Sequence, residues 1–591
     1  MKQFIITMAG VFAGLMIFMI GVPFVLVAMA AGAARPAPVP AHAVLTLDLR
    51  QPLTDQDPAN PLVSLGRRSL SVMSVVETLH RAQDDDRVKV LLVRLPEAGI
   101  EPGAADELRL ALKRFRAQGK KVIVHSQGLY PSGMVASTYM LGASGDELWM
   151  QPGSSFQVTG VAGEDLFFKR FFDKYGIKAD YEQRYEYKNA VNPYLYDDYT
   201  PAHRESNLSW MGSVYANALG AAAADRKKDP AVLRTTLEAG PYLAEDAMKL
   251  GLIDKVGQVK EAETAALAAA GSGGDLIEFG DYARQRKERP HLDGAATLAI
   301  VQAEGPIMTG KDGSSNPFQG SATVYSDDVS EAIYRAVKDK DVRAIVFRVN
   351  SPGGSDTASE QILAAVRAAK AARKPVVVSM GTYGASGGYW IASEASAIVA
   401  EPSTLTGSIG VFGGKFVVGP ALARFGVDIR ETDVGSSYAG AFGMGREFSP
   451  QERAAFAGWM DRIYANFIAR VSTGRKLPED RVREIARGRV WTGVQARELG
   501  LVDEIGGFYQ AVDKAKQLAG ITGEVKLKRM EQGSPLEALQ KVLGVSGTSV
   551  RTLAAAAWVF GDPKAQGLLD DLVSARLRAQ GATVLAPTPL H

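Results

Sequence analysis

The stretch AMKLGLIDKVG at residues 247–257 recurs about 250 residues later as ARELGLVDEIG at residues 496–506. Other blocks recur in the same order and at nearly the same separation. They are VLLVR (90–94) with AIVFR (344–348), and LWMQP (148–152) with IVAEP (398–402). Three ordered blocks at a near-constant separation indicate that the body of the chain is a tandem duplication.

Each copy alternates short β-branched runs with helical patterns. Strands are expected at residues 44–49, 88–95 and 121–126 of the first copy, and at 298–301, 344–349, 375–379 and 397–400 of the second. Between them, residues 328–338 and 358–372 have the apolar spacing of amphipathic helices. This order predicts an α/β fold in which parallel strands are joined by helical crossovers.

Composition excludes several classes of function. The 591 residues carry 67 Lys and Arg against 65 Asp and Glu, a net charge of +2, so no nucleic-acid partner is expected. The absence of cysteine excludes disulfides, thiol catalysis and cysteine-based zinc sites. The six histidines are scattered along the chain, so neither a metal nor another cofactor is expected.

The N-terminus has the character of a membrane segment. No charged residue occurs from Gln3 to Ala34, and a run of that length can span a bilayer. Lys2 precedes the run, which favours a cytoplasmic N-terminus and an exported body. The alanines near its end leave a cleavable signal peptide as the alternative, but the apolar run is longer than the hydrophobic region of a usual signal peptide, so an uncleaved anchor is favoured.

A glycine-rich turn carries the candidate nucleophile. Gly384-Ala385-Ser386-Gly387-Gly388-Tyr389-Trp390 follows a β-branched run and precedes an apolar helical stretch. A serine at such a strand-to-helix turn stands above the sheet beside free backbone N–H groups. Ser386 is therefore a candidate nucleophile, although serines at this position commonly only cap a helix.

Neighbouring strand ends supply the other candidate groups. The strand at 344–349 runs into Asn350-Ser351-Pro352-Gly353-Gly354, whose glycine amides are expected to stand free for an oxyanion. The strand at 397–400 runs into the hydroxyl-rich loop 402–410. No histidine lies between His291 and His591, so the base is either a histidine of the first copy, such as His125, or a buried lysine. From the residues alone, many lysines remain candidates for this base.

Taken together, these features resemble the signal peptide peptidase A (protease IV) family in its long, double-domain form. The resemblance rests on the tandem copies, the N-terminal apolar segment, the SPGG and ASGGYW turns and the PSTLTGSIG loop, and it runs to about Gly523. It implies a Clp/crotonase-like fold for each copy and a serine peptidase with a Ser-Lys dyad.

The resemblance also assigns roles to residues. Ser386 takes the nucleophile's place, and Lys188, in the Tyr187-Lys188-Asn189-Ala190-Val191-Asn192-Pro193 segment of the first copy, takes that of the general base. Gly353 and Gly354 become the oxyanion hole, and Ser408 becomes a hydrogen-bond partner of the lysine.

The duplication offers a check on this division between the copies. Ala136 is expected opposite Ser386 and Tyr438 opposite Lys188, so each copy has kept one half of the dyad. If the difference in loop length between the copies is placed elsewhere in their alignment, Ser132 comes opposite Ser386. Ser132, however, is not followed by the Gly-Tyr-Trp sequence that follows Ser386. Whether the dyad closes within one chain or between chains stays open.

The function implied is a membrane-anchored endopeptidase that degrades cleaved signal peptides and other apolar, unfolded peptides. Its location is the bacterial inner membrane, crossed once, with the catalytic body on the periplasmic side. A homo-oligomer is expected, with a tetramer as one option. Alternatives are a catalytically lapsed membrane scaffold and a crotonase-type acyl-CoA enzyme. Apolar residues after the serine turn are expected to line side-chain pockets, namely Leu405, Ile409, Val411 and Phe412.

The expected domain boundaries follow from the repeat and its flanks. Residues 1–34 are expected to form the anchor, 35–42 a linker, 43–291 the first repeat and 292–523 the second. Residues 524–591 form an extension whose role the sequence does not indicate. Short helices are expected within that extension, at residues 536–542 and 566–578.

Overall fold

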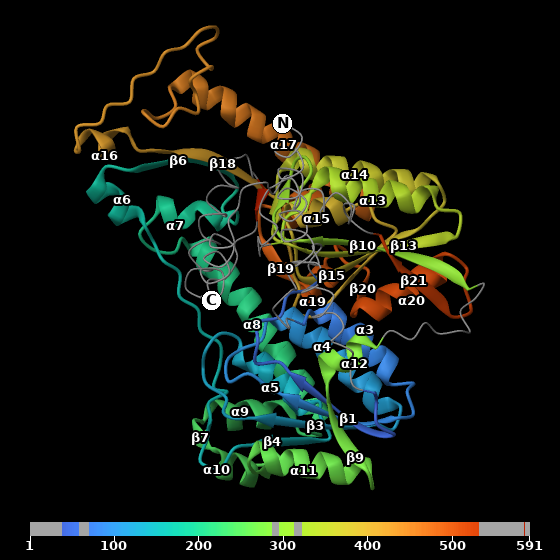
Figure 1. Cartoon of the computed structure of the whole chain (residues 1–591). Coiled ribbons are helices and arrows are strands. Elements are labelled where there is room, and N and C mark those ends of the chain that lie inside the picture. The colour runs from blue at the N-terminus through green and yellow to red at the C-terminus, as the bar shows by residue number, and fades with distance from the viewer. Residues whose placement is uncertain (1–37, 58–69, 286–294, 313–321, 531–583, 586–591) are drawn as a thin grey trace, which may run out of the picture.

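Two parallel sheets form the framework of the molecule. The computed structural model describes residues 38–57, 70–285, 295–312, 322–530 and 584–585. In Figure 1 the first repeat forms the lower half and the second repeat the upper half. An arm made from parts of both repeats projects at the upper left.

The first sheet has six strands in the order β8-β4-β3-β2-β1-β9, and every neighbouring pair is parallel. The strands are β1 (His42–Asp48), β2 (Val88–Arg94), β3 (Lys121–Ser126), β4 (Glu147–Met150), β8 (Lys255–Val256) and β9 (Gly274–Glu278). The three strands expected in this copy are confirmed, and β3 has the bounds that the sequence predicts.

The second sheet repeats that order as β20-β16-β15-β13-β10-β21, again with parallel pairs. Its strands are β10 (Ala296–Glu304), β13 (Val342–Ser351), β15 (Val376–Ala385), β16 (Ala397–Ala400), β20 (Glu504–Ile505) and β21 (Val525–Arg529). β17 (Leu405–Gly407) and β19 (Val490–Thr492) extend this sheet beside the end of β15. The matching strand orders support the tandem duplication.

The second sheet corrects one expected boundary. β21 pairs with β10 along Ala296–Ile300, so the second repeat continues past residue 523 to at least Arg529. The sequence pattern fades there because β21 is an edge strand whose alternate residues are charged lysines exposed to solvent.

Helices separate the two sheets and cover their outer faces. Helices α3 (Val72–Ala82), α4 (Pro102–Ala117) and α5 (Val135–Ala143) share one core cluster with α20 (Phe508–Leu518) and with one face of each sheet. On the outer faces lie α11 (Val259–Ala270) for the first sheet and α13 (Ser326–Lys338), α14 (Asp356–Ala371) and α15 (Gly387–Ala392) for the second.

Strand alternation produces this arrangement, since successive side chains point to opposite faces. In β10, Leu298 and Ile300 pack in the core shared by both repeats, whereas Ala299 and Val301 pack toward α13 and α14. The two repeats therefore bury apolar surface against each other, and each depends on the other for part of its core.

Two long helices link these layers to the arm. Helix α8 (Pro201–Asp225) packs on α5 and reaches β19 of the second repeat. Helix α17 (Pro450–Arg475) packs on β6 (Lys178–Arg184) and β18 (Val411–Val417). A reciprocal capping box between Ser449 and Glu452 fixes where α17 begins. The arm also contains α6 (Lys169–Tyr175), a 3-10 turn (Asn189–Val191), α7 (Asn192–Leu195) and α16 (Gly419–Ala423).

Short elements complete the described chain. The helices are α9 (Pro230–Glu238), α10 (Ala244–Lys249), α12 (Phe279–Arg284), α18 (Glu479–Ile485) and α19 (Gly493–Glu498). The strands are β5 (Ser155–Phe156), β7 (Tyr242–Leu243), β11 (Ile307–Met308), β12 (Val324–Tyr325), β14 (Gly353–Gly354) and β22 (Val584–Leu585). β12, β11, β14 and β22 form a small separate sheet in that order.

Some expectations concern other parts of the chain. The expected anchor at 1–34 and the expected helices at 536–542 and 566–578 lie outside the described residues. Within the described residues, every helix is too short or too polar to cross a membrane.

Candidate active site

Ser386 occupies the turn between β15 and α15, as the sequence predicts. β15 ends at Ala385 and α15 begins at Gly387, and Ser386 between them has φ +55° and ψ −118°. A non-glycine residue with this backbone is strained, and such strain is typical of nucleophile turns. The Ser386 side chain is fully buried.

Glycines let this turn lie against neighbouring backbone. A Cβ atom added at Gly387 would lie 3.0 Å from the Gly354 nitrogen and 3.2 Å from the Gly353 Cα. One added at Gly388 would lie 2.5 Å from the Ser351 carbonyl oxygen. Side chains at these two positions would therefore push the Ser386 turn away from β14 and from the end of β13.

Lys188 reaches the site through a strand pair formed between the repeats. β6 of the first repeat pairs antiparallel with β18 of the second, from Lys178 opposite Val417 to Arg184 opposite Val411. Lys188 follows the end of β6, and Ser408 precedes the start of β18. The strand pairing consequently brings these two residues to the same end of the arm.

The Lys188 amine lies between two serines. Its Nζ is 2.8 Å from Ser386 Oγ, 2.9 Å from the Ser408 carbonyl oxygen and 3.0 Å from Ser408 Oγ. All of these contacts form within one chain. A neutral amine has two N–H donors and one lone pair. The two Ser408 oxygens can take both donors, which leaves the lone pair for the Ser386 hydroxyl.

Burial controls the protonation of this amine. The Lys188 side chain is fully buried, and among the described residues it forms no ion pair. Burial therefore lowers the pKa of Lys188 well below its usual value. The geometry supplies a neutral amine against a serine hydroxyl, which can accept the hydroxyl proton.

Gly488 is a site residue that sequence reasoning missed. Its φ is +81°, and a Cβ atom there would lie 2.5 Å from the Cβ of Lys188. The next residue, Arg489, accepts the Ser408 N–H at its carbonyl at 2.7 Å. The segment 487–489 therefore holds both Lys188 and Ser408, but a lone glycine between two arginines gives no sequence signal of that role.

Gly353 and Gly354, whose amides are the expected oxyanion donors, form the short strand β14. Gly354 pairs with Ile307 of β11, and the Gly353 N–H donates to Ser351 Oγ at 3.2 Å. The Ser355 N–H donates to the Ile307 carbonyl at 2.8 Å, so backbone alternation turns the Gly354 N–H toward the opposite edge of β14. A Cβ atom at Gly354 would lie 2.0 Å from the Ile307 oxygen, so only glycine fits there.

Some expected residues lie elsewhere. Ser132 lies in the loop before α5. Ser386 directly precedes α15, and the residue that directly precedes α5 is Met134, not the expected Ala136. Tyr438 lies in an irregular segment after α16 and packs against Phe442. His125 is buried in the first sheet with Nε2 3.1 Å from the Gly257 carbonyl, so it has a structural role.

The expected side-chain pockets are also corrected. Ile409 and Val411 are fully buried in the core of the second repeat, and Leu405 and Phe412 are nearly so. These hydrophobic residues after the serine turn are therefore packed against other residues of the protein. They do not form an open lining for a ligand.

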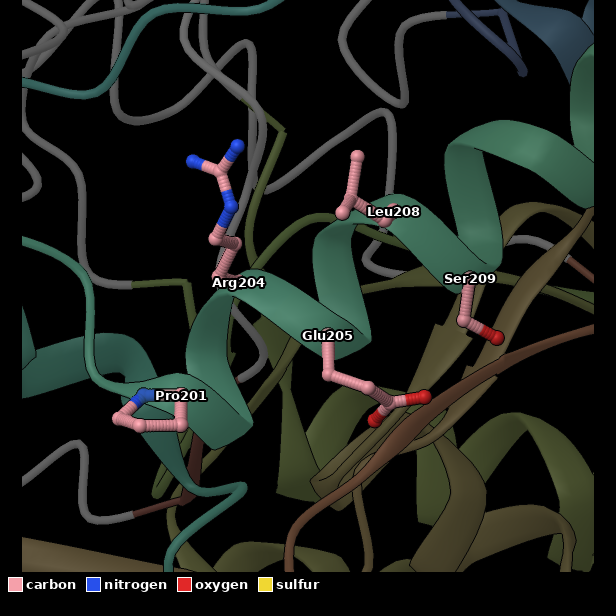
Figure 2. Close-up of a pocket in the computed structure, with 5 residues that line it drawn as sticks. All are labelled: Pro201, Arg204, Glu205, Leu208 and Ser209. Atoms are coloured by element: carbon pink, nitrogen blue, oxygen red, sulfur yellow. The ribbon is translucent and has the colours of Figure 1, made fainter.

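A hollow lies beside the start of α8. It has a volume of about 570 Å³ and lies along the first turns of α8 (Figure 2), lined by Pro201, Arg204, Glu205, Leu208 and Ser209. Glu205 accepts from Arg489 at 2.7 Å, which ties this face of α8 to the segment that holds Ser408. Neither Ser386 nor Lys188 lines the hollow, so the chemistry is placed at the dyad.

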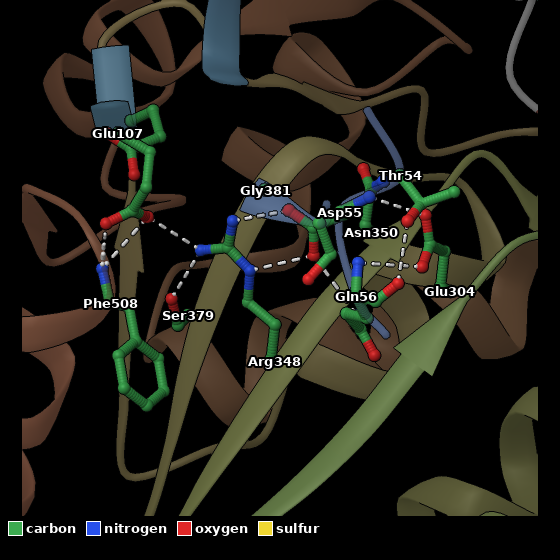
Figure 3. Close-up of polar contacts among 12 residues, drawn as sticks. Thr54, Asp55, Gln56, Glu107, Glu304, Arg348, Asn350, Ser379, Gly381 and Phe508 are labelled. Carbon is green, nitrogen blue, oxygen red and sulfur yellow. Dashed lines mark hydrogen bonds and ion pairs between the residues drawn. The ribbon is translucent and has the colours of Figure 1, made fainter. Parts of the chain in front are cut away.

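A buried ion cluster connects β13, which leads to Gly353, with the first repeat (Figure 3). Arg348 donates to both oxygens of Asp55, at 2.6 and 3.0 Å, and to Glu107 of α4 at 2.9 Å. Its side chain is 1% exposed. Burial beside Asp55 raises the pKa of neighbouring Glu304 to about 7. The charge of Arg348 thus compensates the buried carboxylates of Asp55 and Glu107.

Replacing Arg348 with methionine is expected to lower the free energy of unfolding by about 3–5 kcal/mol, because it leaves buried carboxylates without a counter-charge. Arg343 lies on the same strand with an exposed side chain, so Arg343→Met is the matched control and should change stability by less than about 0.5 kcal/mol. Urea unfolding of the two variants measures the difference. Equal stabilities would show that the cluster does not hold the repeats together.

No group of three or more histidine, aspartate or glutamate side chains in the described part of the chain is arranged to hold a metal ion. The contacts at the dyad involve only an amine, hydroxyls and backbone groups. The chemistry that this arrangement supports is therefore nucleophilic attack by a serine with an amine as base.

Comparison with known proteins agrees with this chemistry. The sequence profile of peptidase family S49 matches residues 114–272 and 368–522, one stretch in each repeat. Protease 4 of Salmonella typhi is 33% identical over 504 residues, which cover 81% of this chain and 79% of that protein. Protease 4 of Haemophilus influenzae is 33% identical over 475 residues (76% and 73%), and the chloroplastic serine protease SPPA of Arabidopsis thaliana is 29% identical over 535 residues (90% and 76%).

Proposed function

Because this chain belongs to peptidase family S49 and is a serine peptidase, we propose that it hydrolyses peptide bonds with Ser386 as nucleophile and Lys188 as general base. The observation that carries the proposal is the 2.8 Å contact between Lys188 Nζ and Ser386 Oγ, both fully buried. Each repeat supplies one member of the dyad, in agreement with the Clp/crotonase-like duplication that the sequence suggests.

The reaction follows from this geometry. Lys188 takes the Ser386 proton as Oγ attacks the carbonyl carbon of the peptide, and Ser408 holds the resulting ammonium through its two oxygens. Lys188 then gives the proton to the departing amine. In the second step it takes a proton from the water that attacks the acyl-serine, and it returns this proton to Ser386 Oγ as the C–Oγ bond breaks and the acid leaves.

The oxyanion is proposed to bind at β14. The Gly354 N–H points to the edge of β14 that faces away from β11, and the Ser386 turn packs against Gly353 and Gly354. A backbone donor positioned for the developing negative charge contributes about 10²–10³-fold to the rate in serine peptidases. Because the two glycines have no side chains, a strand can approach this edge closely, as β22 does in the structure, and a substrate backbone is proposed to pair there.

We propose extended, apolar, unfolded peptides as substrates, including cleaved signal peptides. A strand edge binds a peptide through main-chain pairing, which requires an extended and therefore unfolded chain. The apolar stretch from Gln3 to Ala34 would hold the enzyme at the membrane where such peptides are left. This proposal places the body on the periplasmic side of the bacterial inner membrane.

We also propose that copies of the chain associate, with a tetramer as the state to test, through the arm. β6 and β18 form a separate two-stranded sheet, and two-stranded sheets need further packing for stability. Large apolar side chains are exposed beside it, among them Phe425 at 83% and Val434 at 93%. A second copy of the chain is the proposed occupant of this surface.

Labelling with a fluorophosphonate tests the function against its alternatives. A serine peptidase should be labelled at Ser386, located by peptide mass spectrometry, and should cleave apolar peptides in preference to charged ones. A membrane scaffold that has lost its catalytic activity would be neither labelled nor active. An acyl-CoA enzyme of crotonase type would not use Ser386 as nucleophile, so labelling elsewhere or nowhere would overturn the proposal.

Activity is expected to rise with pH through the lowered pKa of Lys188. Only the neutral amine can accept a proton, and it predominates above that pKa, so kcat/KM should increase with pH and then level. Because burial lowers the pKa of Lys188 well below its usual value, the rise should come far below the pH at which a free lysine titrates. A profile that rises only near the titration of free lysine would contradict this assignment.

A further inference from the structure

We propose that Glu401 is a positioning residue that keeps its proton at neutral pH and donates a hydrogen bond to Glu107, so that loss of this proton releases the loop that holds the dyad. The proposal rests on the function proposed above, because it concerns the same dyad. Glu401 directly follows β16 in the second repeat, and Glu107 belongs to α4 in the first. The hydrogen bond therefore crosses between the repeats.

The main observation is that the Glu401 carboxyl group has no hydrogen-bond donor. Its side chain is fully buried, and neither of its oxygens accepts a hydrogen bond from a residue that the structure describes. An ionised carboxylate can only accept, so a charged Glu401 would leave both buried oxygens unsatisfied. A neutral acid has an O–H that can donate, and the Glu107 carboxylate lies beside it as the acceptor.

Other donors hold Glu107 in its charged form (Figure 3). Arg348 donates to its Oε2 at 2.9 Å, and the Phe508 N–H lies 2.9 and 3.0 Å from its two oxygens. Burial opposes the charge of Glu107, but the hydrogen bond from Glu401, the charge of Arg348 and the Phe508 N–H together lower its pKa. Glu107 is therefore the ionised member of the pair, and Glu401 is the protonated one.

The charges around Glu401 favour its neutral form. Burial raises the pKa of Glu401 well above its usual value, and the charges of Glu107 and Asp106 raise it further. Burial also raises the pKa of Asp106, to about 6, so Asp106 is mostly charged at neutral pH. Arg348 opposes these effects on Glu401, but it already pairs with two carboxylates. The other charged groups of this region are Asp55 and Glu304, beside Arg348, and Arg109, which pairs with Asp225.

The loop that begins at Glu401 is attached to both repeats. The Glu401 N–H donates to Thr404 Oγ1 at 2.9 Å, and this hydroxyl donates to the backbone of β15 at 2.7 Å. On the side of the first repeat, the Ser403 N–H donates to Asp106 Oδ2 at 2.9 Å. The loop thus meets two adjacent carboxylates of α4, those of Asp106 and Glu107. An ionised Glu401 would be repelled by both.

The far end of the same loop holds both members of the dyad. The Gly407 carbonyl accepts the Ser386 N–H at 2.8 Å, and Ser408 accepts from Lys188 at two oxygens. Movement of the loop away from α4 would therefore displace the nucleophile and the base together. A misplacement of about 1 Å can cost about 10²-fold in rate, so the dyad should work only while Glu401 keeps its proton.

The first test compares the natural chain with Glu401→Gln in the pH dependence of kcat/KM, using a fluorogenic peptide of alanine and leucine residues. The amide of the variant can donate to Glu107 as the acid does, but it cannot ionise. Above the plateau set by Lys188, kcat/KM of the natural chain should fall about tenfold per pH unit once Glu401 ionises. Glu401→Gln should match the natural chain at pH 7 within about twofold and keep its plateau at alkaline pH.

Glu498→Gln is the matched control, because Glu498 is exposed at the end of α19 in the same repeat. It should show the same alkaline decline as the natural chain. An equal decline in Glu401→Gln, a natural chain that keeps its plateau to pH 10, or a Glu401→Gln variant that is folded but inactive at pH 7 would overturn the inference and leave the peptidase standing. If none of the chains hydrolysed the peptide at any pH, the proposed function itself would fail.

Two measurements test the proton without hydrolysis. At pH 7 the infrared spectrum of the natural chain should contain a protonated-carboxyl C=O band that Glu401→Gln lacks. Above the usual glutamate pKa the folded chain keeps a proton that the unfolded chain has lost, so rising pH should favour unfolding of the natural chain over Glu401→Gln by about tenfold per pH unit until Glu401 ionises. Lys188 contributes equally in both chains and cancels. An absent band, or a ratio of unfolding constants that does not change with pH, would overturn the inference.

Discussion

Replacing Lys188 with methionine is expected to lower kcat for peptide hydrolysis by about 10²–10⁴-fold, the usual contribution of a general base. Methionine has nearly the length of lysine and suits a fully buried position, but it cannot take the Ser386 proton. Lys188→Arg should be equally inactive, because guanidinium keeps its charge at all working pH values. It should also be less stable, because that charge would be buried among groups that form no ion pair with it.

Stability measurements separate the loss of a base from a loss of fold. Because burial lowers the pKa of Lys188, the folded chain binds fewer protons than the unfolded chain between the lowered pKa and the usual lysine value. Folding at neutral pH therefore releases a proton at a cost, and this cost falls as pH rises. Lys188→Met removes the cost, so it should be at least as stable as the natural chain at pH 7.

Lys120→Met is the control for a general effect of losing a lysine. Lys120 belongs to the first repeat and donates to the carbonyls of Ala82, Asp85 and Val88, away from the dyad. It should keep normal kcat even if its stability falls. Should Lys188→Met retain more than about a tenth of kcat, a base other than Lys188 must operate, since a general base contributes at least about 10²-fold.

The framework of each repeat could be predicted from sequence because its strands are central and apolar. Parallel strands buried on both faces are continuous β-branched runs, so β3 and β16 were predicted with their observed bounds. The edge strand β21 was missed because its alternating charges do not resemble those runs. Pattern reasoning thus predicts the middle of a sheet better than its edge.

The meeting of Lys188 and Ser386 could not be predicted from spacing. It depends on the pairing of β6 with β18, and neither strand has a strong strand pattern. β6 carries charges at alternate positions, and β18 contains Gly413 and Gly414, where Gly414 closely approaches Tyr181. Only the resemblance to a family proposed this lysine over the others. The ion cluster of Arg348 was also missed, because its partner Asp55 lies in the other repeat and sequence spacing does not show that contact.

Replacing Ser386 with alanine is expected to abolish hydrolysis, with a loss in kcat of about 10⁶-fold, as for other serine nucleophiles. Fluorophosphonate labelling should disappear with it. Ser393→Ala is the matched control, because Ser393 is also fully buried and lies at the end of α15. Within the described part of the chain, its hydroxyl donates only to the Trp390 carbonyl, at 2.8 Å. That variant should keep its labelling and its kcat.

The double variant Ser386→Ala/Lys188→Met tests whether the two residues act as one unit. Lys188 acts through Ser386, so its removal should cost nothing further once the hydroxyl is gone, and the double variant should match Ser386→Ala. If the loss of kcat in the double variant equalled the product of the two single losses, each residue would contribute separately to the rate. That result would remove Lys188 from the role of base for Ser386.

Backbone strain gives a second readout at the same position. With φ +55° and ψ −118°, Ser386 has a conformation that glycine adopts freely and alanine does not. Ser386→Gly should therefore be more stable than Ser386→Ala, by about 1–3 kcal/mol, the usual cost of such strain. Both variants should be inactive. Equal stabilities would mean that the turn relaxes once the hydroxyl no longer bonds to Lys188, so that the dyad contact, rather than the surrounding packing, holds the strained backbone.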